Sequence, residues 1–284
     1  MKVTALTFLF APLSMVLVTG QPASIVPETV VVPSGKLRLK AYLWKPTGPG
    51  PFPTVLFNHG SGGADAGHTA GLPMTEAAEK LAPLFLKHGY AFLYLFRRGQ
   101  GLSADQGPFM QDSLRQEEAA KSKEARQHLQ FTLATTDHLD DVLAGLSFLK
   151  TAPAIDAKRI AIVGHSFGGQ VTLLAAERDN TLRAAVTFAA AAGSWQRSAE
   201  LRQRLEAAVE KTTAPIMLIQ AANDYSTAPS KDLADELRRL HKSFGLKIYP
   251  PVGQTSDEGH NFLYLGIPQW EYDVFGFLDE HLKR

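Results

Sequence analysis

Short apolar runs alternate with longer amphipathic segments along most of the chain. The apolar runs are rich in Val, Ile, Leu and Phe, which is typical of strands buried on both faces, and they lie at 54–57, 90–96, 160–163, 184–189, 215–220 and 246–249. The longer segments predict helices at 74–88, 137–150, 199–211, 231–243 and 271–281. Strands that alternate with helices predict an α/β fold, with a mostly parallel central sheet and helices on both faces.

The segment 29–44 has a different pattern. Leu37, Leu39, Ala41 and Leu43 alternate with Arg38, Lys40 and Tyr42, so one face is expected to be buried and the other wet. Pro33-Ser34-Gly35-Lys36 is a turn signal between two such strands. The pattern predicts an antiparallel N-terminal hairpin at the edge of the sheet.

A polar segment at 104–135 interrupts the alternation. Between Arg115 and Gln130 it is dense in Glu, Lys, Arg, Gln and Ala, which predicts a solvated helix inserted between core elements. Such an insertion is either a lid or pocket wall, or a plain surface feature, and the sequence leaves both open. In the first case the pocket-facing residues would be Phe109, Met110, Leu114 and Phe131.

The first residues resemble a targeting segment. Met1-Lys2 precedes a mostly apolar stretch at 3–18, which is broken by Pro12 and Ser14 and followed by small and polar residues. This pattern predicts a signal peptide over 1–22 and a secreted or periplasmic protein, with an α/β domain at 28–284. A buried N-terminal helix and an uncleaved anchor are the alternatives. No later segment has the length of a membrane span, so no stable span is expected after signal removal.

Composition removes several function classes. The 284 residues suffice for one large domain, and a formal net charge of +1 gives no sign of a nucleic-acid partner. There is no cysteine, which excludes disulfides, thiolate metal sites and a cysteine nucleophile.

The clearest chemical motif follows the strand at 160–163. Residues 164–168 have the pattern G-x-S-x-G and lead into a helical run, which is the arrangement of a nucleophile elbow. A serine on such a strained turn stands at a helix N-terminus, and the flanking glycines avoid crowding the neighbouring backbone. The motif predicts Ser166 as a nucleophile. The glycine-rich turn at 60–63, which also follows a strand, is the expected partner in an oxyanion hole.

A serine nucleophile needs an imidazole base, and that imidazole needs an orienting carboxylate. Of the nine histidines, His260 alone lies in a post-strand loop downstream of Ser166. Asp224 directly follows the strand at 215–220, and we prefer it to Asp257 and Glu258, which are expected on the loop surface. The order Ser, Asp, His is the one used on α/β-hydrolase scaffolds.

Other polar residues are given structural roles. His59 is expected to form structural hydrogen bonds and not to act as a base. Asp137, His138 and Asp141 share one helix face, where a metal is conceivable, but the wet side of a helix is the commoner reason for charged residues.

These motifs resemble those of the dienelactone-hydrolase-like members of the α/β-hydrolase superfamily, and also the catalytic domains of prolyl-oligopeptidase-like enzymes. The resemblance rests on Asn58-His59-Gly60-Ser61-Gly62-Gly63, Arg98-Gly99-Gln100-Gly101-Leu102-Ser103, Gly164-His165-Ser166-Phe167-Gly168-Gly169, Asn223-Asp224 and Gly259-His260-Asn261-Phe262. It implies an α/β-hydrolase fold and a Ser166–His260–Asp224 triad. It also implies an oxyanion hole from the N–H groups of Phe167 and a residue near Ser61.

The chain departs from that family at two points. Dienelactone hydrolases proper use a cysteine nucleophile, so dienelactone is a poor substrate expectation here. Such families often carry an Asp two residues before Arg98, where this chain has Phe96.

The expected function is a serine hydrolase acting on a small-molecule carboxylic ester, with no cofactor or metal. A peptidase or amidase, an acyltransferase and a non-catalytic binding protein with the same scaffold are the alternatives.

Overall fold

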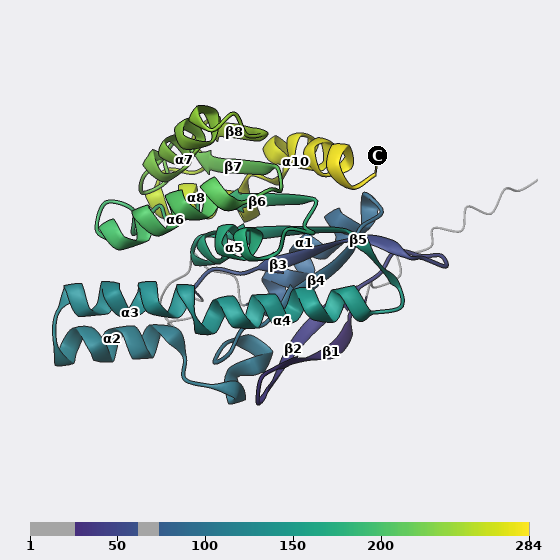
Figure 1. Cartoon of the computed structure of the whole chain (residues 1–284), viewed down its shortest axis with the longest axis horizontal. Coiled ribbons are helices and arrows are strands. Elements are labelled where there is room, and N and C mark those ends of the chain that lie inside the picture. The colour runs from purple at the N-terminus through teal and green to yellow at the C-terminus, as the bar shows by residue number, and fades with distance from the viewer. Residues whose placement is uncertain (1–25, 62–73, 284) are drawn as a thin grey trace, which may run out of the picture.

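The computed structural model describes residues 26–61 and 74–283, and eight strands there form a single sheet (Figure 1). The strands are β1 (Glu28–Ser34), β2 (Leu37–Trp44), β3 (Phe52–Asn58), β4 (Ala91–Leu95), β5 (Ile155–His165), β6 (Ala184–Phe188), β7 (Ile216–Ala221) and β8 (Phe244–Tyr249). Their order is β1-β2-β4-β3-β5-β6-β7-β8. The pairs β1/β2 and β2/β4 are antiparallel and the others are parallel. The predicted mostly parallel sheet with an antiparallel N-terminal hairpin is confirmed.

Helices cover both faces of this sheet (Figure 1). The main ones are α1 (Met74–Lys87), α4 (Asp137–Thr151), α5 (Phe167–Arg178), α6 (Ala199–Lys211), α7 (Ala228–Arg239) and α10 (Ile267–Leu282). Buried residues of α4, α5, α6 and α7 share one apolar core with the sheet, while α1 and α10 contribute to a second core on the other face. The site residues therefore come from a sheet that is packed on both sides.

Strand β5 illustrates why the apolar runs are continuous. Ile160 and Ile162 belong to the core on the α5 face, whereas Ala161 and Val163 belong to the core on the α1 face. All four residues are at most 1% exposed. A strand with helices on both faces needs apolar side chains at successive positions, because neither face is wet.

The polar insertion differs from its prediction. In place of one solvated helix, the chain forms a short 3-10 helix η1 (Gly101–Gln106), then α2 (Met110–Ala120) and α3 (Lys123–Thr135), which lie side by side as a hairpin (Figure 1). The break falls at Ser122, whose side chain accepts a hydrogen bond from the Ala125 N–H and caps α3.

The four predicted pocket-facing residues of the insertion have three different surroundings. Met110 and Leu114 are buried in the apolar core beside α4 and α5, so their assignment to a pocket is wrong. Phe131 lines a cavity, which is described below. Phe109 is the residue before α2 and is partly exposed.

The segment that carries His260 was expected to be a loop and is instead two short helices. They are α8 (Ser256–His260) and α9 (Phe262–Leu265). The helix α8 begins with a capping box, in which Thr255 accepts from the Glu258 N–H and Glu258 accepts from the Thr255 N–H.

The predicted signal peptide at 1–22 lies outside the described residues, as do Gly62 and Gly63 of the glycine turn. Within 26–61 and 74–283, no helix combines the length and the apolar content of a membrane span.

Candidate active site

Ser166 occupies a tight turn between β5 and α5, as the glycine pattern predicts. Its backbone has a φ of 56°, in the left-handed region, and its N–H donates to the Phe188 carbonyl at 2.8 Å. A Cβ added at Gly164 would lie 2.3 Å from the Thr172 hydroxyl, and one added at Gly168 would lie 2.1 Å from the Asn58 carbonyl oxygen. Both positions therefore require glycine, and the turn is fixed on each side of the serine.

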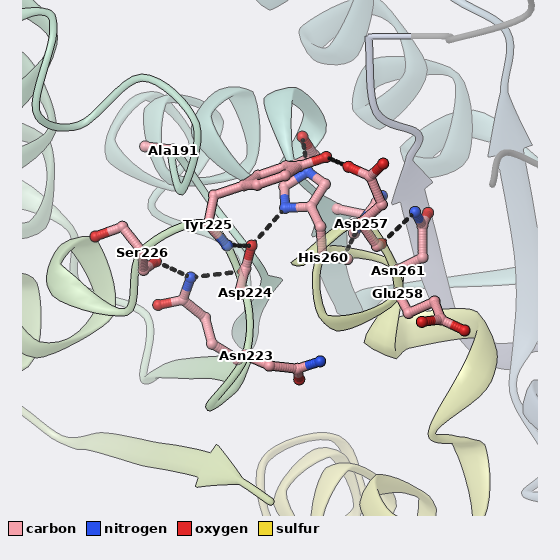
Figure 2. Close-up of polar contacts among 12 residues, drawn as sticks. Ala191, Asn223, Asp224, Tyr225, Ser226, Asp257, Glu258, His260 and Asn261 are labelled. Carbon is pink, nitrogen blue, oxygen red and sulfur yellow. Dashed lines mark hydrogen bonds and ion pairs between the residues drawn. The ribbon is translucent and has the colours of Figure 1, made fainter. Parts of the chain in front are cut away.

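The three residues predicted to act together are hydrogen-bonded in a line. His260 Nε2 lies 2.8 Å from Ser166 Oγ. His260 Nδ1 lies 2.8 Å from Asp224 Oδ1 (Figure 2). With Nδ1–H donating to the carboxylate, Nε2 is left as the acceptor for the serine hydroxyl proton. The Asp224 side chain is fully buried, whereas 13% of the His260 side chain is exposed.

Asp224 is held by more than the histidine. It follows β7, and its carboxylate also accepts from the Gln220 amide at 2.9 Å and from the Tyr225 N–H at 2.7 Å. Three donors around one buried carboxylate fix its orientation.

Close backbone approach brings the His260 segment to Asp224. A Cβ added at Gly259 would lie 2.5 Å from the carbonyl carbon of Asn223. The Asn223 side chain in turn donates to the carbonyl oxygens of Val252 and Thr255, both at 2.9 Å. The close approach at Gly259 and the hydrogen bonds of Asn223 therefore hold His260 next to Asp224.

His165 also contacts the His260 segment, which the sequence did not indicate. Its Nε2–H donates to the His260 carbonyl oxygen at 2.8 Å. Burial, together with the nearby His260, lowers the pKa of His165 to about 4, so its ring is neutral near pH 7. A neutral donor here holds the His260 backbone without adding charge beside the imidazole.

Tyr225 and Asp257 form a bridge beside His260 (Figure 2). The Tyr225 hydroxyl donates to Asp257, and the Tyr225 ring lies 4.6 Å from the His260 ring, centroid to centroid. Burial and this hydrogen bond raise the pKa of Tyr225 above its usual value. Because Asp257 binds Tyr225 and Glu258 caps α8, the carboxylate that contacts His260 is Asp224.

The loop after β3 approaches Ser166, and the side chains of Arg97 and Gln100 hold it in place. A Cβ added at Gly60 would lie 3.6 Å from the Cβ of Ser166. Arg97 donates to the carbonyl oxygens of His59 and Gly60 at 2.7 and 2.8 Å, and Gln100 donates to that of Ser61 at 2.6 Å. These bonds keep the loop close to the serine.

The two predicted oxyanion donors are the N–H groups of Phe167 and Ser61. Phe167 is the first residue of α5, so its N–H has no acceptor within the helix. Ser61 ends the described part of the β3 loop. Their role in binding an oxyanion remains a prediction.

His59 has the structural surroundings expected of it. It is buried, and its Nε2 accepts from the Arg97 N–H at 3.3 Å. Burial and the adjacent Arg97 lower its pKa well below the usual value.

Of the helix face that carries Asp137, His138 and Asp141, only Asp137 is wet, with 51% of its side chain exposed, so the expectation of a wet surface is wrong for the other two. His138 is 2% exposed and Asp141 is fully buried. Asp141 accepts from the Arg98 guanidinium and from the Ser34 hydroxyl, and Asp137 pairs with Arg98. Within the described part of the chain, no group of three His, Cys, Asp or Glu residues is placed to hold a metal ion.

Phe96 fills the position where related families often carry an aspartate. It is fully buried, and a Cβ added at Gly101 would lie 2.3 Å from its ring. Aromatic packing against Gly101 therefore takes the place of a carboxylate at the start of the Arg98 loop.

A cavity lies where α3 meets α5 and α6. Its volume is about 10 Å³, enough for one water molecule, and it is lined by Gln127, Gln130, Phe131, Gln170, Ser194, Arg197, Ser198 and Leu201. The insertion contributes Gln127, Gln130 and Phe131 of α3 to this lining, and Arg197, Ser198 and Leu201 come from the start of α6 and the residues before it.

The sequence of this chain matches the model of a known protein family. The model of the dienelactone hydrolase family matches residues 39–263. The quorum-quenching protein AidA of Acinetobacter baumannii (strain MDR-ZJ06) is 29% identical over 161 residues, which are 57% of this chain and 43% of that protein. The chain thus spans less than half the length of this curated relative.

Solved structures share the fold at lower identity. Est1E from Butyrivibrio proteoclasticus, solved with ferulic acid bound, superposes with a TM-score of 0.63 at 18% identity, covering 90% of this chain and all of that one. The acylaminoacyl peptidase of Pyrococcus horikoshii has a TM-score of 0.63 at 19% identity, covering 91% of this chain and 42% of that one. The architecture is the α/β-hydrolase fold.

Proposed function

The chain belongs to the dienelactone hydrolase family, and on that premise we propose that it is a serine hydrolase of carboxylic esters. The observation that carries the proposal is the line of hydrogen bonds from Ser166 through His260 to Asp224, with 2.8 Å at each step. In this chain, which has no cysteine, the nucleophile is a serine.

In the proposed reaction, Ser166 Oγ attacks the ester carbonyl carbon while its proton passes to His260 Nε2. The buried carboxylate of Asp224 stabilises the resulting imidazolium and keeps the proton of Nδ1 in place. The N–H groups of Phe167 and Ser61 stabilise the negative charge on the carbonyl oxygen.

Collapse of the tetrahedral intermediate breaks the bond to the leaving alcohol, which takes the proton from His260 Nε2. Water then attacks the acyl-enzyme, with His260 as the base, and releases the acid and the Ser166 hydroxyl. Each step is a proton transfer or an acyl transfer, so the reaction needs no cofactor or metal.

The proposal includes export. It is supported by Met1-Lys2 and the apolar stretch at 3–18, which have the pattern of a secretory signal. Expression of the full chain in a bacterial host, followed by N-terminal sequencing of the periplasmic fraction, tests it. We expect a mature N-terminus between residues 20 and 24; intact protein in the cytoplasm would contradict export.

Hydrolysis of p-nitrophenyl esters of graded acyl length tests the activity, with Ser166→Ala as the control. We expect turnover that is lost in the variant. If the folded wild type hydrolyses none of these esters, the ester claim fails, and peptide amides and acyl transfer are the next reactions to assay. Failure of a fluorophosphonate to label Ser166 would favour a non-catalytic binding protein.

A further inference from the structure

Arg97 is a buried cation with no described carboxylate within ion-pair distance. Its side chain is fully buried shortly after β4, and the nearby Asp141 carboxylate binds Arg98 instead. Burial lowers the pKa of Arg97 to about 10, so its guanidinium is still charged near pH 7. Its Nε and Nη1 atoms have no hydrogen-bond partner among the described residues. Burying such a charge costs stability, which points to a role beyond holding the fold together.

The remaining nitrogen of this guanidinium binds the loop after β3. Arg97 Nη2 donates to the carbonyl oxygens of His59 and Gly60, at 2.7 and 2.8 Å. His59 Nε2 accepts from the Arg97 N–H, so the ring proton is on Nδ1, which lies 2.8 Å from the same Gly60 oxygen. The Gly60 carbonyl therefore accepts two hydrogen bonds, and these fix its direction.

The direction of the Gly60 carbonyl also fixes that of the Ser61 N–H. The two groups belong to one trans peptide plane, in which C=O and N–H point in opposite directions. The Ser61 N–H, which is the predicted oxyanion donor of this loop, therefore points away from the Arg97 guanidinium. Gly60 itself lies against the nucleophile, since a Cβ added there would lie 3.6 Å from the Ser166 Cβ.

The second predicted oxyanion donor belongs to a residue that Arg97 also contacts. The central carbon of the guanidinium lies 5.5 Å from the centre of the Phe167 ring, and Phe167 begins α5. Burial, together with Arg97, lowers the pKa values of His59 and His138 well below the usual value. Both rings are neutral near pH 7, so the positive charge next to the two donor residues is that of Arg97. A fixed charge in a buried site stabilises a developing anion more than it would in water.

We propose that Arg97 is a positioning residue of the oxyanion hole. It orients the Ser61 N–H, and its charge favours the negative oxygen of the tetrahedral intermediate. The inference rests on the proposed function, because acyl transfer to Ser166 creates this oxygen. Arg97 acts through the peptide group and not by touching the substrate. Its hydrogen bond to the Gly60 carbonyl polarises that peptide, so the Ser61 N–H becomes a stronger donor.

Arg97→Met and Arg97→Lys separate the charge from the packing. Methionine keeps apolar bulk but removes the charge and both hydrogen bonds. Lysine keeps the charge, and one ammonium nitrogen can replace Nη2, which alone binds both carbonyls. We expect kcat/KM for p-nitrophenyl acetate to fall about 100-fold in Arg97→Met and less than about tenfold in Arg97→Lys. Circular dichroism and thermal unfolding establish folding. The neutral Arg97→Gln, with the same expected loss, replaces Arg97→Met if that variant does not fold.

Binding of a trifluoromethyl ketone measures the oxyanion without ester hydrolysis. The probe is 1,1,1-trifluoro-4-phenylbutan-2-one, and its adduct is followed by fluorine NMR. Ser166 Oγ bonds to the ketone carbon, the carbonyl electron pair moves to oxygen, and the serine proton passes to His260 Nε2. We expect the dissociation constant to rise about 100-fold in Arg97→Met and less than about tenfold in Arg97→Lys. Arg98→Lys, at the adjacent residue that binds Asp137 and Asp141, is the control and should change it less than about threefold.

The two measurements separate this inference from the proposed function. Less than a tenfold effect of Arg97→Met on both, or equal losses in Arg97→Met and Arg97→Lys, would overturn the inference. If the wild type hydrolyses the ester and the folded variants do so equally well, the function stands and the inference falls. If the wild type hydrolyses no ester but ketone binding is weakened in Arg97→Met and kept in Arg97→Lys, the function fails and the inference stands. A wild type that neither hydrolyses the ester nor binds the ketone would contradict both.

Discussion

Asp224→Asn is the substitution whose effect the structure defines most closely. The carboxylate accepts three hydrogen bonds, from His260 Nδ1–H, the Tyr225 N–H and the Gln220 amide. An asparagine has one oxygen and one NH₂ group at the same place. If its oxygen faces His260, its NH₂ meets the Gln220 amide, which is also a donor. If its NH₂ faces His260, Nδ1 must become the acceptor and the imidazole proton moves to Nε2. A protonated Nε2 cannot take the proton of the Ser166 hydroxyl.

Either orientation removes the negative charge beside the imidazolium. At the observed 2.8 Å between His260 Nδ1 and Asp224 Oδ1, Coulomb's law with an effective dielectric constant of about 20 gives about 6 kcal/mol. Most of this attraction arises as His260 becomes protonated in the transition state. We therefore expect kcat/KM for p-nitrophenyl acetate to fall by about 10⁴-fold.

Asp257→Asn is the matched control, because Asp257 is the nearby carboxylate that contacts Tyr225 instead of His260. Its loss of kcat/KM should stay below about tenfold. Circular dichroism and thermal unfolding establish that both variants fold. A folded Asp224→Asn enzyme with less than a tenfold loss, or a larger loss in Asp257→Asn, would refute the assignment of the histidine partner.

Three further predictions follow from the neighbours of His260. His165, with a pKa lowered to about 4, is neutral when folded but protonates near its usual 6.5 when unfolded, so acid destabilises the fold as the pH falls from about 6.5 to 4. His165→Gln should reduce this loss by up to about 3 kcal/mol in urea unfolding across that range; an unchanged pH dependence would contradict it. Tyr225→Phe keeps the ring on His260 but breaks the hydrogen bond to Asp257, so kcat should fall less than about threefold. Tyr225→Ala also removes the ring, and kcat should fall about tenfold. Equal effects of the two variants would show that the ring does not position the imidazole. Gly259→Ala places a Cβ 2.5 Å from the Asn223 carbonyl carbon and should displace His260, so kcat/KM should fall about 100-fold in a protein that still folds. Near-wild-type activity would show that the backbone shifts there at little cost in free energy.

The residues of the candidate site were predictable because parallel strands constrain where loops lie. Ser166 and Asp224 each follow an apolar run directly, and the carboxyl ends of neighbouring parallel strands meet at one edge of the sheet. Once those strands were identified, few positions remained for a serine and its partners. His260 needed only the further condition of lying downstream, although its local structure is helical and not a loop.

Contacts between distant segments were not predictable in this way. Asp141 is buried because it binds Arg98, 43 residues earlier, and Ser34, 107 residues earlier, while its own helix gives the pattern of a surface position. His165 binds the backbone of His260, 95 residues away. Helical periodicity describes which residues share a face, but not whether a partner from another element covers that face.

Covalent labelling is the sharpest test of whether Ser166 is a nucleophile activated by His260. The mature protein is treated with a fluorophosphonate, and the adduct is located by peptide mass spectrometry in the wild type and in His260→Ala. We expect stoichiometric labelling of Ser166 in the wild type and labelling at least 100-fold slower in the variant, because the general base is removed. An unlabelled Ser166 in folded wild type, or equal rates in both proteins, would contradict it.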